Sequence, residues 1–134
     1  MWVFTRYGFY SIACASKKDG SLDDQSLMIR ARCKAHLLSL QKRFPALADG
    51  KILELPHRDY GYRLIIPKAS WIAILGELAQ EQEWSNFKDE AARYQGASGR
   101  GYVDALHEVW GVMNRLQQDE NRPQQSSQGR FRPK

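Results

Sequence analysis

Two cysteines, Cys14 and Cys33, are too few for a disulfide framework in a chain of 134 residues. Each lies beside apolar residues in a predicted strand, so we expect buried free thiols. No run approaches the roughly 18 apolar residues that a membrane-spanning helix needs. The segment 1–4 is not preceded by the charged residues, nor followed by the long apolar run, that mark a signal peptide. We therefore expect a cytoplasmic protein that does not enter the membrane.

Motifs for catalysis or metal binding are also scarce. The three histidines have no metal-ligand spacing among themselves or with the cysteines, so we expect no metal and no cofactor. His57 lies beside Asp59 ahead of a predicted strand, which makes it the best candidate for a general acid or base. A small hydrolase or nuclease that uses His57, Asp59 and nearby arginines is one hypothesis, although the sequence as a whole leans against an enzyme.

Acidic residues are absent from the C-terminal end, where much of the net charge of +5 lies. Residues 121–134 carry four basic side chains and no acid, which leaves 16 basic and 15 acidic side chains in residues 1–120. Phe131 is the single apolar side chain of that segment, too little to offset the entropy of ordering it. We expect one domain over 1–117 and a disordered basic tail over 118–134.

What the chain does contain is a doubled pattern of two strands followed by a helix. Aromatic and β-branched residues predict a strand over 2–14 with a bend near Gly8, and strict alternation predicts strands over 27–33 and 60–66. A shorter strand is expected over 51–55. Helical spacing of apolar residues predicts helices over 34–44 and 68–82, with Trp71, Ile72, Leu75, Leu78 and Ala79 buried.

This order matches an α+β fold of ferredoxin-like type, a split βαβ arrangement whose last strand has moved to the N-terminus. The right-handed crossover rule then makes 27–33 and 60–66 the central pair, with 2–14 and 51–55 outside them. The apolar residues of 102–116 add C-terminal helices, in which we expect Trp110 and Met113 to be buried.

Alternation in the two central strands places Arg30, Arg32 and Arg63 side by side on the face of the sheet away from the helices. Three guanidinium groups on one face need partners. We expect the C-terminal helices to cover this face, because their apolar stripe is too large to leave in water, and to supply carboxylates from Asp89, Asp104 or Glu108. An anion or ligand pocket and an RNA-binding face are the alternatives.

Several short segments, taken together, resemble a family of small bacterial proteins described only as hypothetical, with no assigned activity. They are Met1–Phe4, Gly8–Ser11, Arg30–Arg32, Asp59–Arg63, Asn86–Lys88 and Val109–Met113. The resemblance covers about residues 1–116 and implies a bacterial, cytoplasmic protein without carrying over a catalytic role. It singles out Arg30, Arg32, Asp59, Tyr60, Tyr62, Arg63, Asn86, Phe87, Lys88 and Trp110.

The sequence therefore favours a non-catalytic binding protein, whose partner is another protein or a second copy of the chain. The alternative is an RNA-binding module that uses the arginine-bearing sheet face and the basic tail. Our candidate ligand-binding residues are Arg30, Arg32, Arg63, Tyr62, His57, Asp59 and Lys88.

Overall fold

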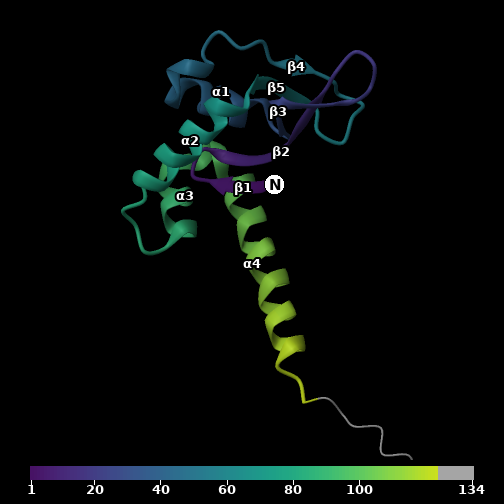
Figure 1. The fold of residues 1–134 in the computed structure, drawn as a ribbon. Coiled ribbons are helices and arrows are strands. Elements are labelled where there is room, and N and C mark those ends of the chain that lie inside the picture. The colour runs from purple at the N-terminus through teal and green to yellow at the C-terminus, as the bar shows by residue number, and fades with distance from the viewer. Residues whose placement is uncertain (124–134) are drawn as a thin grey trace, which may run out of the picture.

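Five strands form one antiparallel sheet in the order β1-β2-β3-β5-β4. A computed structural model describes residues 1–123, and Figure 1 shows the sheet with its helices. The strands are β1 (Trp2–Thr5), β2 (Gly8–Ser16), β3 (Leu22–Ala31), β4 (Leu53–Glu54) and β5 (Tyr62–Pro67). The helices are α1 (Lys34–Arg43), α2 (Lys68–Gln80), α3 (Phe87–Gln95) and α4 (Arg100–Glu120), with 3-10 turns η1 (Pro45–Leu47) and η2 (Ala97–Gly99).

The predicted central pair is confirmed. β3 pairs with β5 in antiparallel register, with Ile29 opposite Leu64 and Arg30 opposite Arg63. Both strands alternate between buried and more exposed side chains, as a sheet with one covered face requires. The α+β class predicted from the sequence is therefore confirmed.

The predicted single strand over 2–14 is wrong, because the chain reverses between β1 and β2. The Thr5 hydroxyl accepts hydrogen bonds from the amides of Tyr7 (3.1 Å) and Gly8 (3.2 Å), which closes a tight turn. Gly8 has a φ of 153°, and a Cβ there would lie 2.3 Å from Cγ of His36. β1 is thus an additional edge strand, and the ferredoxin-like assignment stays a prediction.

The core lies on one face of the sheet, under α1 and α2. Side chains from β3 and β5 pack there against Leu37 and Leu40 of α1 and Trp71 of α2. The predicted buried face of α2 is partly wrong, since Ile74 is buried while Ile72 is 65% exposed and Ala79 is exposed as well. The strip of α2 that faces the sheet is narrower than its apolar content suggested, so the surplus apolar side chain remains in water.

The C-terminal helices approach the second face of the sheet only near β1 and the start of β2, and they leave the rest of that face uncovered. α3 and α4 pack on each other and on the β1–β2 turn, and α4 then runs away from the rest of the domain (Figure 1). α4 continues to Glu120, three residues beyond the predicted domain end at 117. The remainder of the predicted tail, from residue 124, lies outside the described residues.

The cysteines differ from the prediction as well. β3 ends at Ala31, so Cys33 leaves the sheet and is exposed at the start of α1, while Cys14 is half-buried in β2. A run that alternates through 27–33 does not reveal where pairing stops, and the last two residues of the predicted strand instead lead into the helix.

Candidate functional site

The largest group of exposed apolar side chains lies on α4. Leu106 is 5% exposed, but the apolar residues after it are open to solvent, with Trp110 at 57%. The predicted burial of Trp110 and Met113 is therefore wrong. We call these residues the α4 stripe: Val109, Trp110, Val112, Met113 and Leu116.

Spacing along the helix explains why the stripe is continuous. Its members recur at three- and four-residue intervals from Leu106, so they share one side of α4, while Asp104, Gly111 and Gln118 lie on the opposite side. No proline interrupts residues 100–120. The stripe extends along the part of α4 that stands clear of the sheet in Figure 1.

A groove of about 840 Å³ begins where the stripe meets the domain. One wall is α4, with Leu106 and Val109, and the other carries Trp2, Phe4 and Phe9 from the β1–β2 hairpin. Trp2 is 68% exposed, and its ring packs edge-on against Phe9 with 5.6 Å between centroids. Val109 belongs to both the groove and the stripe, so together they form one apolar surface.

The first turn of α4 is held firmly against the domain. The Tyr102 hydroxyl donates a hydrogen bond to the Thr5 carbonyl oxygen (2.7 Å), and its ring centroid lies 4.9 Å from that of His36. Burial raises the pKa of Tyr102, so its hydroxyl stays protonated and remains a donor. Burial also lowers the pKa of His36, whose Nδ1 accepts a hydrogen bond from the Phe9 amide (3.3 Å).

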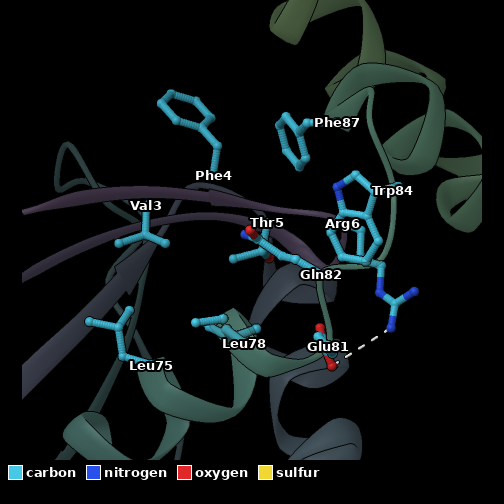
Figure 2. Close-up of a pocket in the computed structure, with 11 residues that line it drawn as sticks. Val3, Phe4, Thr5, Arg6, Leu75, Leu78, Glu81, Gln82, Trp84 and Phe87 are labelled. Carbon is cyan, nitrogen blue, oxygen red and sulfur yellow. Dashed lines mark ion pairs between the residues drawn. The ribbon is translucent and has the colours of Figure 1, made fainter.

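Arg6, in the β1–β2 turn, joins that turn to α3 and to the end of α2. Its guanidinium lies 2.8 Å from Glu90 and 3.6 Å from Glu81, and it sits within 5.6 Å of the ring centroids of Tyr7, Trp84 and Tyr94. Figure 2 shows Arg6 beside Trp84 and reaching towards Glu81, next to a smaller pocket under β1. Sequence reasoning missed this cluster, because, apart from Tyr7, the residues around Arg6 lie about 75 to 90 residues further along the chain.

The same cluster changes the acidity of Glu90. Hydrogen bonds from Arg93 and Arg6 lower the pKa of Glu90 to about 2. Its side chain therefore stays ionised well into the acid range, and the attachment of α3 to the turn depends on that charge.

The predicted arginine face is partly assembled around Tyr60. The guanidinium carbons of Arg30 and Arg32 lie 4.9 and 4.4 Å from the centroid of the Tyr60 ring, which is itself buried. Arg30 also donates to the Ser11 hydroxyl (2.8 Å), and Arg32 forms an exposed ion pair with Asp59 (2.8 Å). The ring and the hydroxyl thus take the place that we had assigned to carboxylates of the C-terminal helices.

Arg63 completes this face beside its strand neighbour Arg30. Its Nε donates to the Tyr60 carbonyl oxygen (3.4 Å), and one terminal nitrogen lies 3.6 Å from the sulfur of Met28. Within residues 1–123 neither Arg30 nor Arg63 forms an ion pair, so the expected carboxylate partners are wrong for both. Tyr62 is in register with Ala31 and points to the opposite, core-facing side.

The remaining candidates lie apart from this face. His57 is exposed in the loop before β5 and lines neither the groove nor the smaller pocket. Lys88 is in α3, where its Nζ lies 4.7 Å above the Trp110 ring. This cation–π contact covers one side of the ring and leaves the rest of the stripe open.

Among the described residues, no group of histidine, cysteine or acidic side chains could hold a metal ion. In the same part of the chain, no helix has the length and apolar character needed to cross a bilayer.

Comparison of the chain with protein families, with curated proteins and with solved structures finds no match. The resemblance to small bacterial proteins accordingly stays a prediction, so function has to be inferred from the geometry of the α4 stripe, the groove and the arginine-bearing sheet face.

Proposed function

We propose that this protein is a non-catalytic binding protein of the bacterial cytoplasm, and that it docks another polypeptide along α4. The observation that carries the proposal is the α4 stripe, which continues a buried helix face into solvent. Soluble monomers rarely expose so many large apolar side chains side by side, and such patches mark interaction sites. The bacterial and cytoplasmic parts of the proposal rest on the sequence alone.

Trp110 has the properties of an interface anchor. Tryptophan is enriched among the residues that dominate binding energy, and here Lys88 holds the ring in place before any partner arrives. Covering the stripe would remove apolar surface from water at roughly 25 cal/mol per Å². The groove beside Leu106 extends that surface into a concave site, which suits side chains inserted by a partner.

The lining of the groove also favours binding over catalysis. It contains no carboxylate, and the Nδ1 of its one histidine, His36, is occupied by the Phe9 amide. The hydrolase hypothesis relied on His57 and Asp59, but the Asp59 carboxylate binds Arg32 and neither residue lines a described pocket. A catalytic group would need a substrate site within hydrogen-bond reach.

The proposal is tested by site-specific photo-crosslinking in the cells that produce the protein. A photoreactive phenylalanine analogue replaces Val112 in the stripe, and a matched control carries it at Gln118 on the opposite side of α4. We expect covalent adducts with a defined polypeptide from position 112 and none from 118. Equal yields at both positions, or no adduct from 112, would refute docking along α4.

A second candidate function, RNA binding, is favoured by the open sheet face. Arg30 and Arg63 are neighbouring cations without a carboxylate partner in residues 1–123, and the rings of Phe9 and Trp2 lie on the same side. RNA-recognition sheets combine stacking rings and cations in this way. We infer that the ferredoxin-like core, β2-β3-β5-β4, presents this face, with β1 as an addition; the strand order supports that reading.

RNA binding is measured by fluorescence anisotropy with a mixed-sequence single-stranded RNA at several salt concentrations. If the sheet face binds phosphates, Arg30→Ala and Arg63→Ala weaken binding and each lowers the salt slope by about one. Lys42→Ala, on the exposed side of α1, is the control. No binding by the parent chain at low salt would remove this candidate.

A further inference from the structure

We propose that the groove between α4 and the β1–β2 hairpin binds a small-molecule carboxylate, a ligand with one anionic head and an apolar body. The head lies at the N-terminus of α1, and the body lies against the wall formed by Trp2, Phe4 and Phe9. This inference goes beyond polypeptide docking, because it concerns the groove alone and holds with or without a partner on the α4 stripe.

The groove has the size and the walls of a small-molecule site. Its volume of about 840 Å³ lies within the range of roughly 300–1,000 Å³ that is typical of ligand pockets. The rings of Tyr94 from α3 and Tyr102 from α4 line it together with the three rings of the hairpin. An apolar body therefore leaves water for a surface that carries rings on several elements, which favours a flat aromatic ligand.

The charge of the lining favours an anion. Among the described residues that line the groove, Arg32 is the single charged side chain, because burial lowers the pKa of His36 and keeps it neutral. One terminal nitrogen of Arg32 binds Asp59 in an exposed ion pair, while its Nε and its other terminal nitrogen form no hydrogen bond within residues 1–123. Since exposed ion pairs are weak, a ligand carboxylate can share this guanidinium with Asp59.

The N-terminus of α1 adds backbone donors beside Arg32. Cys33 is the N-cap of this helix and makes no side-chain hydrogen bond there. The amides of Lys34 and Ala35 have no acceptor within residues 1–123, and Arg32, Cys33 and Ala35 all line the groove. The first turn of a helix carries free N–H groups and a partial positive charge, which together favour an anion.

A buried donor without a partner points to a ligand at the same place. His36 is 8% exposed and lines the groove in the first turn of α1. Its Nδ1 accepts the hydrogen bond from Phe9, so the proton of the neutral ring is on Nε2. Within residues 1–123 this Nε2 has no acceptor, yet the atom is not sealed from solvent. A carboxylate oxygen in the groove satisfies this donor.

The ligand class is tested with 2-naphthoate, and 2-naphthalenemethanol is the matched neutral probe. By isothermal titration calorimetry of the full chain, we expect a dissociation constant of about 100 µM or lower for the naphthoate. The alcohol should bind at least about tenfold more weakly, because charged groups form the stronger hydrogen bonds. No binding of naphthoate, or equal affinities for the two probes, overturns the inference.

Two-dimensional amide NMR locates the probe on the protein. Naphthoate should shift the amide signals of Lys34 and Ala35 at the N-terminus of α1, because the carboxylate accepts their hydrogen bonds. The signals of Val112 and Leu116 should stay in place. Shifts confined to these two residues of the α4 stripe would show nonspecific binding to an exposed apolar surface and would overturn the inference.

Substitutions of Arg32 and its partner Asp59 should act in opposite directions. Arg32→Gln removes the cation and should weaken naphthoate binding about tenfold, with little change for the alcohol. Asp59→Asn removes the carboxylate that competes for Arg32, so naphthoate should bind about twofold to fivefold more tightly. Arg115→Gln, which is exposed on α4 outside the lining, is the control. Weaker binding by both Arg32→Gln and Asp59→Asn would show that the pair only supports the fold, and would overturn the inference.

Occupation of the groove is tested by filling it. Ala105 is exposed and lines the groove, so Ala105→Trp places a ring there without disturbing the core, and both probes should lose at least about tenfold in affinity. His107→Trp, on the other side of α4, is the matched control. Unchanged naphthoate binding by a folded Ala105→Trp variant overturns the inference, whereas docking along α4 is judged separately by crosslinking from Val112.

Discussion

The two halves of α4 carry the same kind of side chain on the same side of one helix, yet they have different surroundings. In the first half, Tyr102 binds Thr5, and Leu106 is buried in the lining of the groove. In the second half, the side chains of the α4 stripe are exposed, Lys88 of α3 contacts one of their rings, and the end of α4 projects away from the sheet (Figure 1). Amphipathic character thus predicts that a helix face needs a cover, but the position of the rest of the fold decides whether the chain itself supplies that cover.

The largest change in the free energy of unfolding should come from the Arg6 cluster. This cluster joins the β1–β2 turn, on which the first half of α4 packs, to α3 and to the end of α2. We expect Arg6→Ala to lower the free energy of unfolding by about 3–4 kcal/mol, because it removes a charged hydrogen bond to Glu90 and a guanidinium that packs on three aromatic rings, although Glu90 keeps Arg93 and Glu81 keeps Arg43. Urea denaturation measures the change. Arg93→Ala, which removes the exposed partner of Glu90, is the control and should cost much less; equal losses would contradict a central role for Arg6.

The comparison between the halves is tested directly by a pair of leucine truncations. Leu106→Ala should cost about 2–4 kcal/mol as a large-to-small change in a packed site. Leu116→Ala, at a side chain that is 58% exposed, should stay within about 0.5 kcal/mol. If the two variants lost similar stability, the second half of α4 would be packed against the domain and the distinction would disappear.

A smaller effect is expected at the junction of α4 with the turn. Tyr102→Phe removes one buried hydrogen bond to the Thr5 carbonyl oxygen and should cost about 1 kcal/mol. Tyr94→Phe is a suitable control, since the hydroxyl of Tyr94 makes no hydrogen bond within the described residues. Thermal denaturation of the two variants against the parent measures the difference.

The smallest effect on stability is expected only at acidic pH. Because the folded pKa of Glu90 is about 2, below its ordinary value of 4.5, its ionised form stabilises the fold above pH 4.5 and that stabilisation disappears as the pH falls towards 2. We expect the melting temperature of the parent to fall more steeply over this range than that of Glu90→Gln. Parallel pH profiles would show that Glu90 is not coupled to folding.

The sequence predicted the local periodicities well. Alternation in 27–31 and 62–66 arises from the geometry of each strand, so the pairing of β3 with β5 and the identity of the core face could be predicted without any long-range information. The error at Ile72 has a different origin. A helix with apolar residues on more than half of its circumference does not indicate which strip faces the sheet, and only the packing of α2 selects Ile74.

The sequence predicted individual residues of the candidate site, but it did not predict which groups they contact. Arg30 and Arg63 share a face as expected, but their partners are a hydroxyl, a ring and a carbonyl group, none of which has a charge pattern that the sequence could display. The stripe on α4 was recognised, whereas its exposure depends on where α3 and the β1–β2 turn hold the helix. Arg6 marks that position, and nothing near it in the sequence distinguishes it from a surface arginine.

Because α4 projects from the domain, the folding of its last turns and the binding of a partner are coupled equilibria. Beyond Trp110, whose ring contacts Lys88 of α3, α4 continues for ten residues from Gly111 to Glu120, about 15 Å of helix, which is too short to be stable as an isolated helix in water. Its amides should therefore exchange with solvent deuterium faster than those near Leu106, with protection decreasing towards the C-terminus. A partner that binds the helical form must also supply the free energy that keeps these turns folded, so substitutions of high helix propensity at Gly111 would tighten association without touching the interface.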